Sequence, residues 1–115
     1  MRQAVPADDS KRAAYRALED RVRTGPGHAS PEERDRAFRN AGLDAPLDGL
    51  LGDVATRPTQ VTDLQFSAAR AAGYSEDQLF ELVICAAVGQ AGRQYDAGLA
   101  ALADAVAAEE DQRAS

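Results

Sequence analysis

The chain has few of the residues on which redox and metal chemistry depend. Its 115 residues include one cysteine, one histidine and no tryptophan. A single cysteine excludes an intrachain disulfide and a cysteine-based zinc site, and a single histidine excludes a metal site built on a histidine pair. We therefore expect no metal ion and no other cofactor.

Long apolar runs and an excess of positive charge are also missing. No segment approaches the run of about 18 apolar residues that crosses a membrane, and the N-terminus has no apolar signal region. The formal net charge is −6, and an acidic chain repels phosphate backbones. These absences predict a cytoplasmic protein that binds neither membranes nor nucleic acid.

Alanine is the residue that the chain has in abundance, with 25 copies. Alanine favours helices but buries little apolar area, so the core of a single copy would be thin. A thin core predicts either an oligomer or helices that pack very closely.

Capping residues and helix breakers predict a single all-α domain of about five helices and no strands. The expected helices begin at one of residues 8–10, at 30, at 46, at 59 or 62, and at 75, and they end near residues 24, 41, 57, 73 and 108. In the last of them, the apolar residues beyond residue 94 share one face, which indicates a one-sided amphipathic helix. These residues are Tyr95, Leu99, Leu102 and Val106.

Two serines mark the clearest helix starts. Ser30 and Ser75 are followed three residues later by Glu33 and Gln78, the spacing of a capping box. Gly73 fits the left-handed position that ends a helix. The segment 89–92, with a glycine at each end, is where the last helix could kink, or where another helix could approach closely.

The stretch around Gly73 resembles a known superfamily. An Ala-rich helix closing on Gly73 is followed by Ser-Glu-Asp-Gln at 75–78, by Leu-Phe-Glu-Leu at 79–82, and by an Ala-rich apolar helix. This order is similar to the carboxymuconolactone decarboxylase and alkylhydroperoxidase-D superfamily, over about residues 45–107. The resemblance implies an alkylhydroperoxidase-D-like helical core at 45–107, a variable N-terminal helical arm at 1–42, and trimers or hexamers that assemble through the Ala-rich helices.

The thiol peroxidase branch of that superfamily carries a Cys-x-x-Cys-x-x-x-His motif before the glycine. Counting back from Gly73 places these three residues at Pro58, Val61 and Gln65, so none is retained. The branch needs one thiolate to attack the peroxide and a second thiol to resolve the product. A chain with one cysteine cannot run this cycle, so we reject thiol peroxidase activity, and decarboxylase-type activity would need acid–base side chains from elsewhere.

The weak catalytic candidates are Glu81 and His28. A buried Glu81 would have a raised pKa and could act as an acid or base. The favoured alternative is a structural ion pair with Arg70 or Arg93 of another subunit, and a third possibility is a solvent-exposed position. His28 could be a general base, although such a residue is more often a solvated loop histidine.

Three further residues could line a remaining pocket, namely Gln65, Arg93 and Tyr95. Gln65 lies on the helix that corresponds to the lost thiol site, and Tyr95 is more often a core residue with its hydroxyl at the surface. We expect Cys85 to be a small buried core residue and not a reactive thiol, because no neighbour within a helical turn would lower its pKa.

These observations leave three functional hypotheses. The leading one is a non-thiol, non-catalytic oligomeric binding or scaffold protein of the superfamily. The second is a thiol-independent lyase or isomerase of the carboxymuconolactone decarboxylase type that acts on a small organic acid. The third is an adaptor that docks a partner enzyme through its N-terminal arm.

Overall fold

The computed structural model describes the backbone of residues 5–114 and the side chains of residues 10–114. Within this range the chain is all helical and has no strand, as the sequence predicted. The elements are α1 (Val5–Thr24), α2 (Pro31–Arg39), α3 (Leu47–Thr56), the short 3-10 helix η1 (Pro58–Gln60), α4 (Asp63–Ala71) and α5 (Glu76–Ala114).

Local capping sets most of these boundaries. At Ser75 and Gln78 the predicted capping box is present, with reciprocal hydrogen bonds of 2.8 and 3.1 Å. Ser30 accepts from the backbone N–H of Glu33 at 3.1 Å. The Glu33 carboxylate, however, accepts a hydrogen bond from the hydroxyl of Tyr74 at 2.8 Å. The Glu33 side chain, which the sequence predicts to complete the capping box of Ser30, instead binds Tyr74, a residue distant in sequence.

Two predicted helix ends are wrong in detail. α2 stops at Arg39 because Asn40 takes the left-handed conformation with φ of 53°, so the helix ends before Gly42. α5 ends at Ala114 and not near residue 108. It runs unbroken through both glycines of the segment 89–92, so the kink does not occur there and the alternative, a close approach of another helix, is what Gly89 allows. Gly73 does adopt a positive φ of 110° after α4, as expected.

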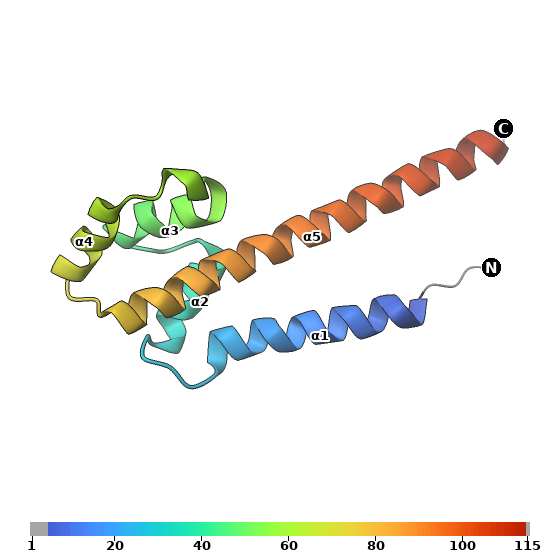
Figure 1. Cartoon of the computed structure of the whole chain (residues 1–115). Coiled ribbons are helices and arrows are strands. Elements are labelled where there is room, and N and C mark those ends of the chain that lie inside the picture. The colour runs from blue at the N-terminus through green and yellow to red at the C-terminus, as the bar shows by residue number, and fades with distance from the viewer. Residues whose placement is uncertain (1–4, 115) are drawn as a thin grey trace.

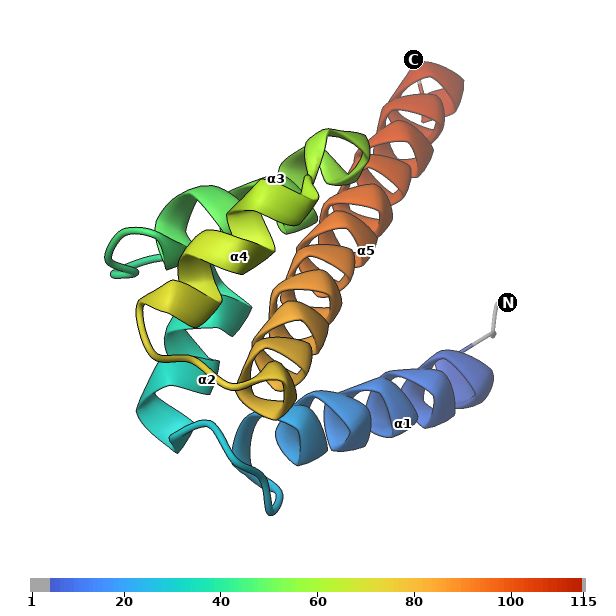
Figure 2. The ribbon, with the colours of Figure 1, turned by 60° about the vertical axis from the view of Figure 1, so that its left-hand side comes forward.

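The core lies where α2 and α3 pack against the N-terminal half of α5 (Figures 1 and 2). Its largest fully buried side chains are Leu50, Leu51, Leu82 and Cys85. The rest of the buried cluster is mostly alanine, so the core is as thin as the composition predicts. α2 is firmly held in it, because Ala37 has no exposed surface.

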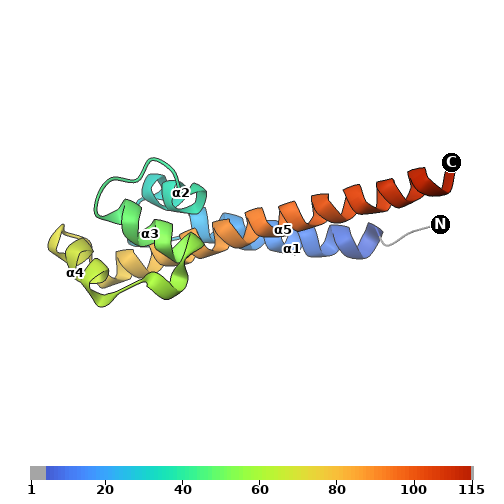
Figure 3. The same ribbon diagram turned by 90° about the horizontal axis from the view of Figure 1, so that it is seen from above.

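The molecule is elongated because α5 continues far beyond this core. Figure 3 shows α2, α3 and α4 gathered at one end of α5, with the start of α1 and the end of α5 toward the other end. The radius of gyration is 18.2 Å and the longest dimension is 62 Å, whereas a compact domain of this size has a radius of gyration of about 13 Å. A large part of α5 therefore has little of its own chain packed against it.

Candidate functional site

Glu81, the charged residue within the apolar start of α5, binds the loop between α1 and α2. Its carboxylate accepts hydrogen bonds from the backbone N–H groups of His28 and Ala29, all at 2.8 Å. The Nδ1 atom of His28 lies 3.0 Å from the same carboxylate. We call this arrangement the loop joint. It fixes the loop before α2 onto α5, across 53 residues of sequence.

The loop joint overturns the expected protonation of Glu81. Burial raises the pKa of this carboxyl, but hydrogen bonds from the backbone of Ala29 and His28, and from the His28 side chain, outweigh burial and lower the pKa overall. Arg70 and Arg93, the two expected partners, have other partners within the chain. Arg70 pairs with Glu76 at 3.1 Å, and Arg93 donates to the carbonyl of Phe38 at 2.7 Å.

The adjacent end of α1 is held by two buried groups. Arg34 is only 4% exposed and donates to the carbonyl oxygens of Gly25, at 2.7 Å, and Val22, at 3.4 Å. The thiol of Cys85 donates to the same Val22 carbonyl at 3.3 Å. A cation and donors at a helix C-terminus satisfy its unpaired carbonyls, so both residues serve packing between α1, α2 and α5.

Cys85 has the environment of a structural thiol. Its side chain is buried, and burial is the main cause that raises its pKa. A raised pKa keeps the thiol protonated and therefore weakly nucleophilic. This agrees with the prediction that Cys85 is a core residue.

The two catalytic candidates thus meet within one chain, but their geometry favours a structural role. Both oxygens of the Glu81 carboxylate already accept N–H groups, and the lowered pKa keeps the group ionised at neutral pH. The His28 side chain is 66% exposed, and its Nε2 atom lies 3.8 Å from Asp77. His28 is therefore a solvated loop histidine held between two carboxylates.

The three candidate pocket residues have contacts in different parts of the molecule. Gln65 completes the cap of α4 at Thr62 and donates to Asp53 at 2.9 Å. Arg93 binds the last turn of α2 through the Phe38 carbonyl. Tyr95 lies against Tyr15 of α1, with ring centroids 6.0 Å apart. The structure does not gather them around one cavity.

Sequence reasoning missed the surface that most distinguishes the molecule, the part of α5 beyond the core. We call residues 93–114 the α5 extension. Its apolar stripe is Tyr95, Leu99, Leu102 and Val106, spaced by four, three and four residues. Leu102 is 60% exposed and Val106 is 45% exposed. The amphipathic pattern was visible in the sequence, but it could not show that the helix projects.

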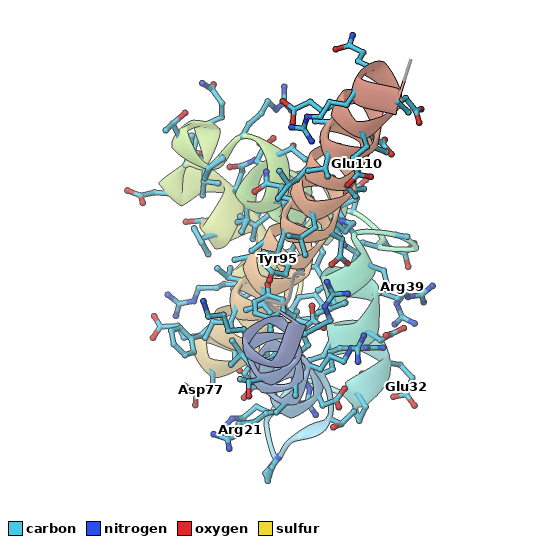
Figure 4. The ribbon with its side chains drawn as sticks, turned by 90° about the vertical axis from the view of Figure 1, so that its right-hand side faces the viewer. Arg21, Glu32, Arg39, Asp77, Tyr95 and Glu110 are labelled. Atoms are coloured by element: carbon cyan, nitrogen blue, oxygen red, sulfur yellow. The ribbon has the colours of Figure 1, made fainter. Side chains whose placement is uncertain are left out.

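The α5 extension and α1 diverge from the contact between Tyr15 and Tyr95, and we call the wedge between them the fork. Figure 4 looks along α1 and shows Tyr95 between α5 and α1, with Glu110 far out on α5. A hollow of about 70 Å³ marks the base of the fork. It is lined by Arg12, Tyr15, Arg16, Glu19, Tyr95 and Asp96.

The two sides of the fork carry opposite charge. Residues 10–24 of α1 include five basic and two acidic side chains, a net charge of +3. The α5 extension includes two basic and five acidic side chains, a net charge of −3. Three consecutive acidic residues, at 109–111, lie near its end.

The chain matches no known protein family, no curated protein and no solved structure. Within residues 5–114, no set of three or more His, Cys, Asp or Glu side chains is placed to hold a metal ion. Over the same range, no helix has the length and apolar character needed to cross a membrane.

Proposed function

We propose that this protein is a non-catalytic helical scaffold that assembles with copies of itself through the α5 extension. The observation that carries the proposal is the exposed apolar stripe on a helix that projects beyond its own core. Leu102 and Val106 are among the large apolar side chains that stay exposed in the isolated chain.

The physical argument concerns helix stability. The α5 extension has 22 residues and is about 33 Å long at 1.5 Å per residue. Most of the stability of such a helix comes from packing of its amphipathic face and not from intrinsic propensity. Because the stripe repeats every three or four residues, it matches the a and d positions of a coiled coil. A second copy of the same helix offers the same stripe.

The resemblance to the carboxymuconolactone decarboxylase superfamily supports the same proposal. It implies trimers or hexamers that assemble through Ala-rich helices, and α5 is the helix concerned. The retained features are the glycine after α4 and the capping box before α5, whereas the thiol positions hold other residues. Loss of the thiol site with retention of the packing helix fits a binding or scaffold role.

The alternatives have weaker support. A thiol-independent lyase or isomerase would need Glu81 as an acid or base, yet both of its oxygens are occupied by the loop joint. An adaptor that docks through residues 1–42 would need those helices to be free, yet α2 belongs to the core. α1, in contrast, is largely exposed beyond residue 10 and is available for assembly.

The test is a double substitution on the stripe. We expect Leu102→Glu with Val106→Glu to yield a monomer, because the contact between two copies would then bury four introduced carboxylates. The matched control is Ala100→Glu with Ala107→Glu, which adds the same charge at two exposed positions outside the stripe. Light scattering coupled to size-exclusion chromatography measures the mass, and circular dichroism checks that both variants remain helical.

The wild type and the control should share one oligomeric mass, which the stripe variant loses. A wild-type chain that stays monomeric at about 100 µM, well above the micromolar dissociation constants of modest complexes, would contradict the proposal. A stripe variant with the wild-type mass would contradict it as well.

A further inference from the structure

We propose that a second copy seats in the fork in an antiparallel, two-fold arrangement, so that the acidic end of its α5 extension lies against Arg12 and Arg16 of α1. This inference rests on the proposed self-assembly and adds the orientation, the register and the residues that select them. The occupant of the fork is thus a second copy of this chain.

The register follows from the position of the stripe. If two α5 extensions cross with Leu102 of each copy at the two-fold axis, Leu99 of one copy lies beside Val106 of the other. The same register places Tyr95 opposite residue 109. Glu109 and Glu110 of one copy then reach the base of the other copy's fork, where Arg12 and Arg16 line the hollow beside Tyr95.

Charge selects this orientation over the parallel one. A parallel pair would bring the acidic residues at 109–111 of both copies together, which is unfavourable. The antiparallel pair places them instead beside α1, whose residues 10–24 carry a net charge of +3. Because a two-fold contact is isologous, each attraction occurs twice.

Other charged side chains near the base of the fork reduce the attraction between the two copies without reversing it. Glu19 and Asp96 line the hollow together with the two arginines. On the α5 extension, Glu109 is 3.9 Å from Arg113, and both side chains are more than two-thirds exposed. Such an exposed pair contributes little, so Glu109 can turn toward a second copy at small cost.

The experiment is a charge swap measured by the dissociation constant of the self-association. Arg12→Glu with Arg16→Glu should weaken the association by about 10-fold or more, since four attractions become repulsions. Glu109→Arg with Glu110→Arg should weaken it similarly, and this second variant leaves α1 untouched. The four substitutions together should restore the affinity to within about 3-fold of wild type.

The control is Arg21→Glu with Arg39→Glu, which changes the net charge by the same amount. Figure 4 shows both arginines directed away from Tyr95 and the fork, so we expect a much smaller change. The loss in the fork variants should also shrink in about 1 M NaCl, where the screening length is about 3 Å.

The outcomes separate this inference from the proposed function. The association could depend on Leu102 and Val106 and yet respond equally to the fork variants and the control variant. That result would overturn the seating in the fork, but the scaffold proposal would stand. Failure of the fourfold variant to recover would also overturn it, because the paired charges would not be neighbours. A monomeric wild type would overturn both.

Discussion

Replacing Gly89 with alanine is expected to destabilise the fold by about 3 kcal/mol, at the upper end of the cost of overpacking a core. Gly89 lies in α5 where α2 crosses it, and a Cβ atom built there would overlap the carbonyl oxygen of Phe38. The obstacle is backbone, so no side-chain rotation can relieve it. α2 would have to move away from α5, which would open the packing around Ala37 and Cys85. Urea unfolding followed by circular dichroism measures the loss.

Gly98→Ala is the matched control for Gly89→Ala. Gly98 lies in the same helix, and a Cβ atom at this position would meet no other atom within 4 Å. Alanine is favoured over glycine in a helix by about 1 kcal/mol, so this variant should be at least as stable as the wild type. Similar unfolding midpoints for the two alanine variants would show that α2 and α5 do not meet closely at Gly89.

The contact at Gly89 also explains why the sequence predicted the helices but could not decide between a kink and a close helix contact at residues 89–92. Capping residues and glycines act locally, so Ser75, Gln78 and Gly73 could be assigned correctly from their neighbours alone. Gly89 has two physical meanings, a weak point in a helix or a place where another backbone approaches. Only the position of Phe38, 51 residues earlier in the chain, decides between them.

The candidate site was predictable to a similar degree. The sequence could single out Glu81, because a carboxylate among apolar residues must find partners. It could not name those partners, because they are backbone N–H groups of a loop that is distant in sequence. Residue types such as arginine give no indication of a backbone donor. The sequence contains one indication of this contact, the glycine at position 27. The structure explains this glycine, because a Cβ atom there would come within 2.7 Å of the Glu81 carboxylate.

Arg93 is a second residue whose partner the sequence could not name, and here the partner is a backbone carbonyl. The sequence offers it as a pocket residue or as a partner for Glu81, but its guanidinium binds the Phe38 carbonyl in the last turn of α2. A cation at the C-terminus of a helix is favourable. The residue therefore works together with Gly89 to hold α2 against α5.

The second large effect is expected at the loop joint. Glu81→Gln keeps the shape of the side chain but removes the charge to which two backbone N–H groups, those of His28 and Ala29, donate. Hydrogen bonds to a charged acceptor contribute about 1.5–3 kcal/mol, so we expect a loss of about 2 kcal/mol in the free energy of unfolding at pH 7. His28→Ala should have a much smaller effect, because it removes only the exposed side chain and keeps the backbone N–H.

Glu76→Gln is the control for this substitution. Glu76 is on the same helix, but its ion pair with Arg70 is largely exposed, and such pairs contribute about 0.5 kcal/mol. If Glu81→Gln had no larger effect than Glu76→Gln, the charge of Glu81 would contribute no more to stability than an exposed ion pair does. If His28→Ala were as damaging as Glu81→Gln, the imidazole and not the backbone would be the important donor.

The loop joint also predicts how the difference between the wild type and Glu81→Gln depends on pH. Because the pKa of Glu81 is lowered on folding, the ionised carboxylate contributes stability that is fully present above about pH 4.3, the ordinary value for glutamate. This contribution is lost as the pH falls through the lowered folded pKa, so the two unfolding free energies should converge in acid.

Other carboxylates do not obscure this comparison. The pKa of Asp35 is lowered mainly by a hydrogen bond from Arg23, and that of Asp53 mainly by one from Gln65. These groups lose their contributions in the same acidic range, but they do so equally in the wild type and the variant and cancel in the difference. Urea unfolding at several pH values between about 2.5 and 7 would measure the convergence. A difference that stays constant over this range would mean that it does not come from the ionisation of Glu81, and that the charge of Glu81 does not hold the loop.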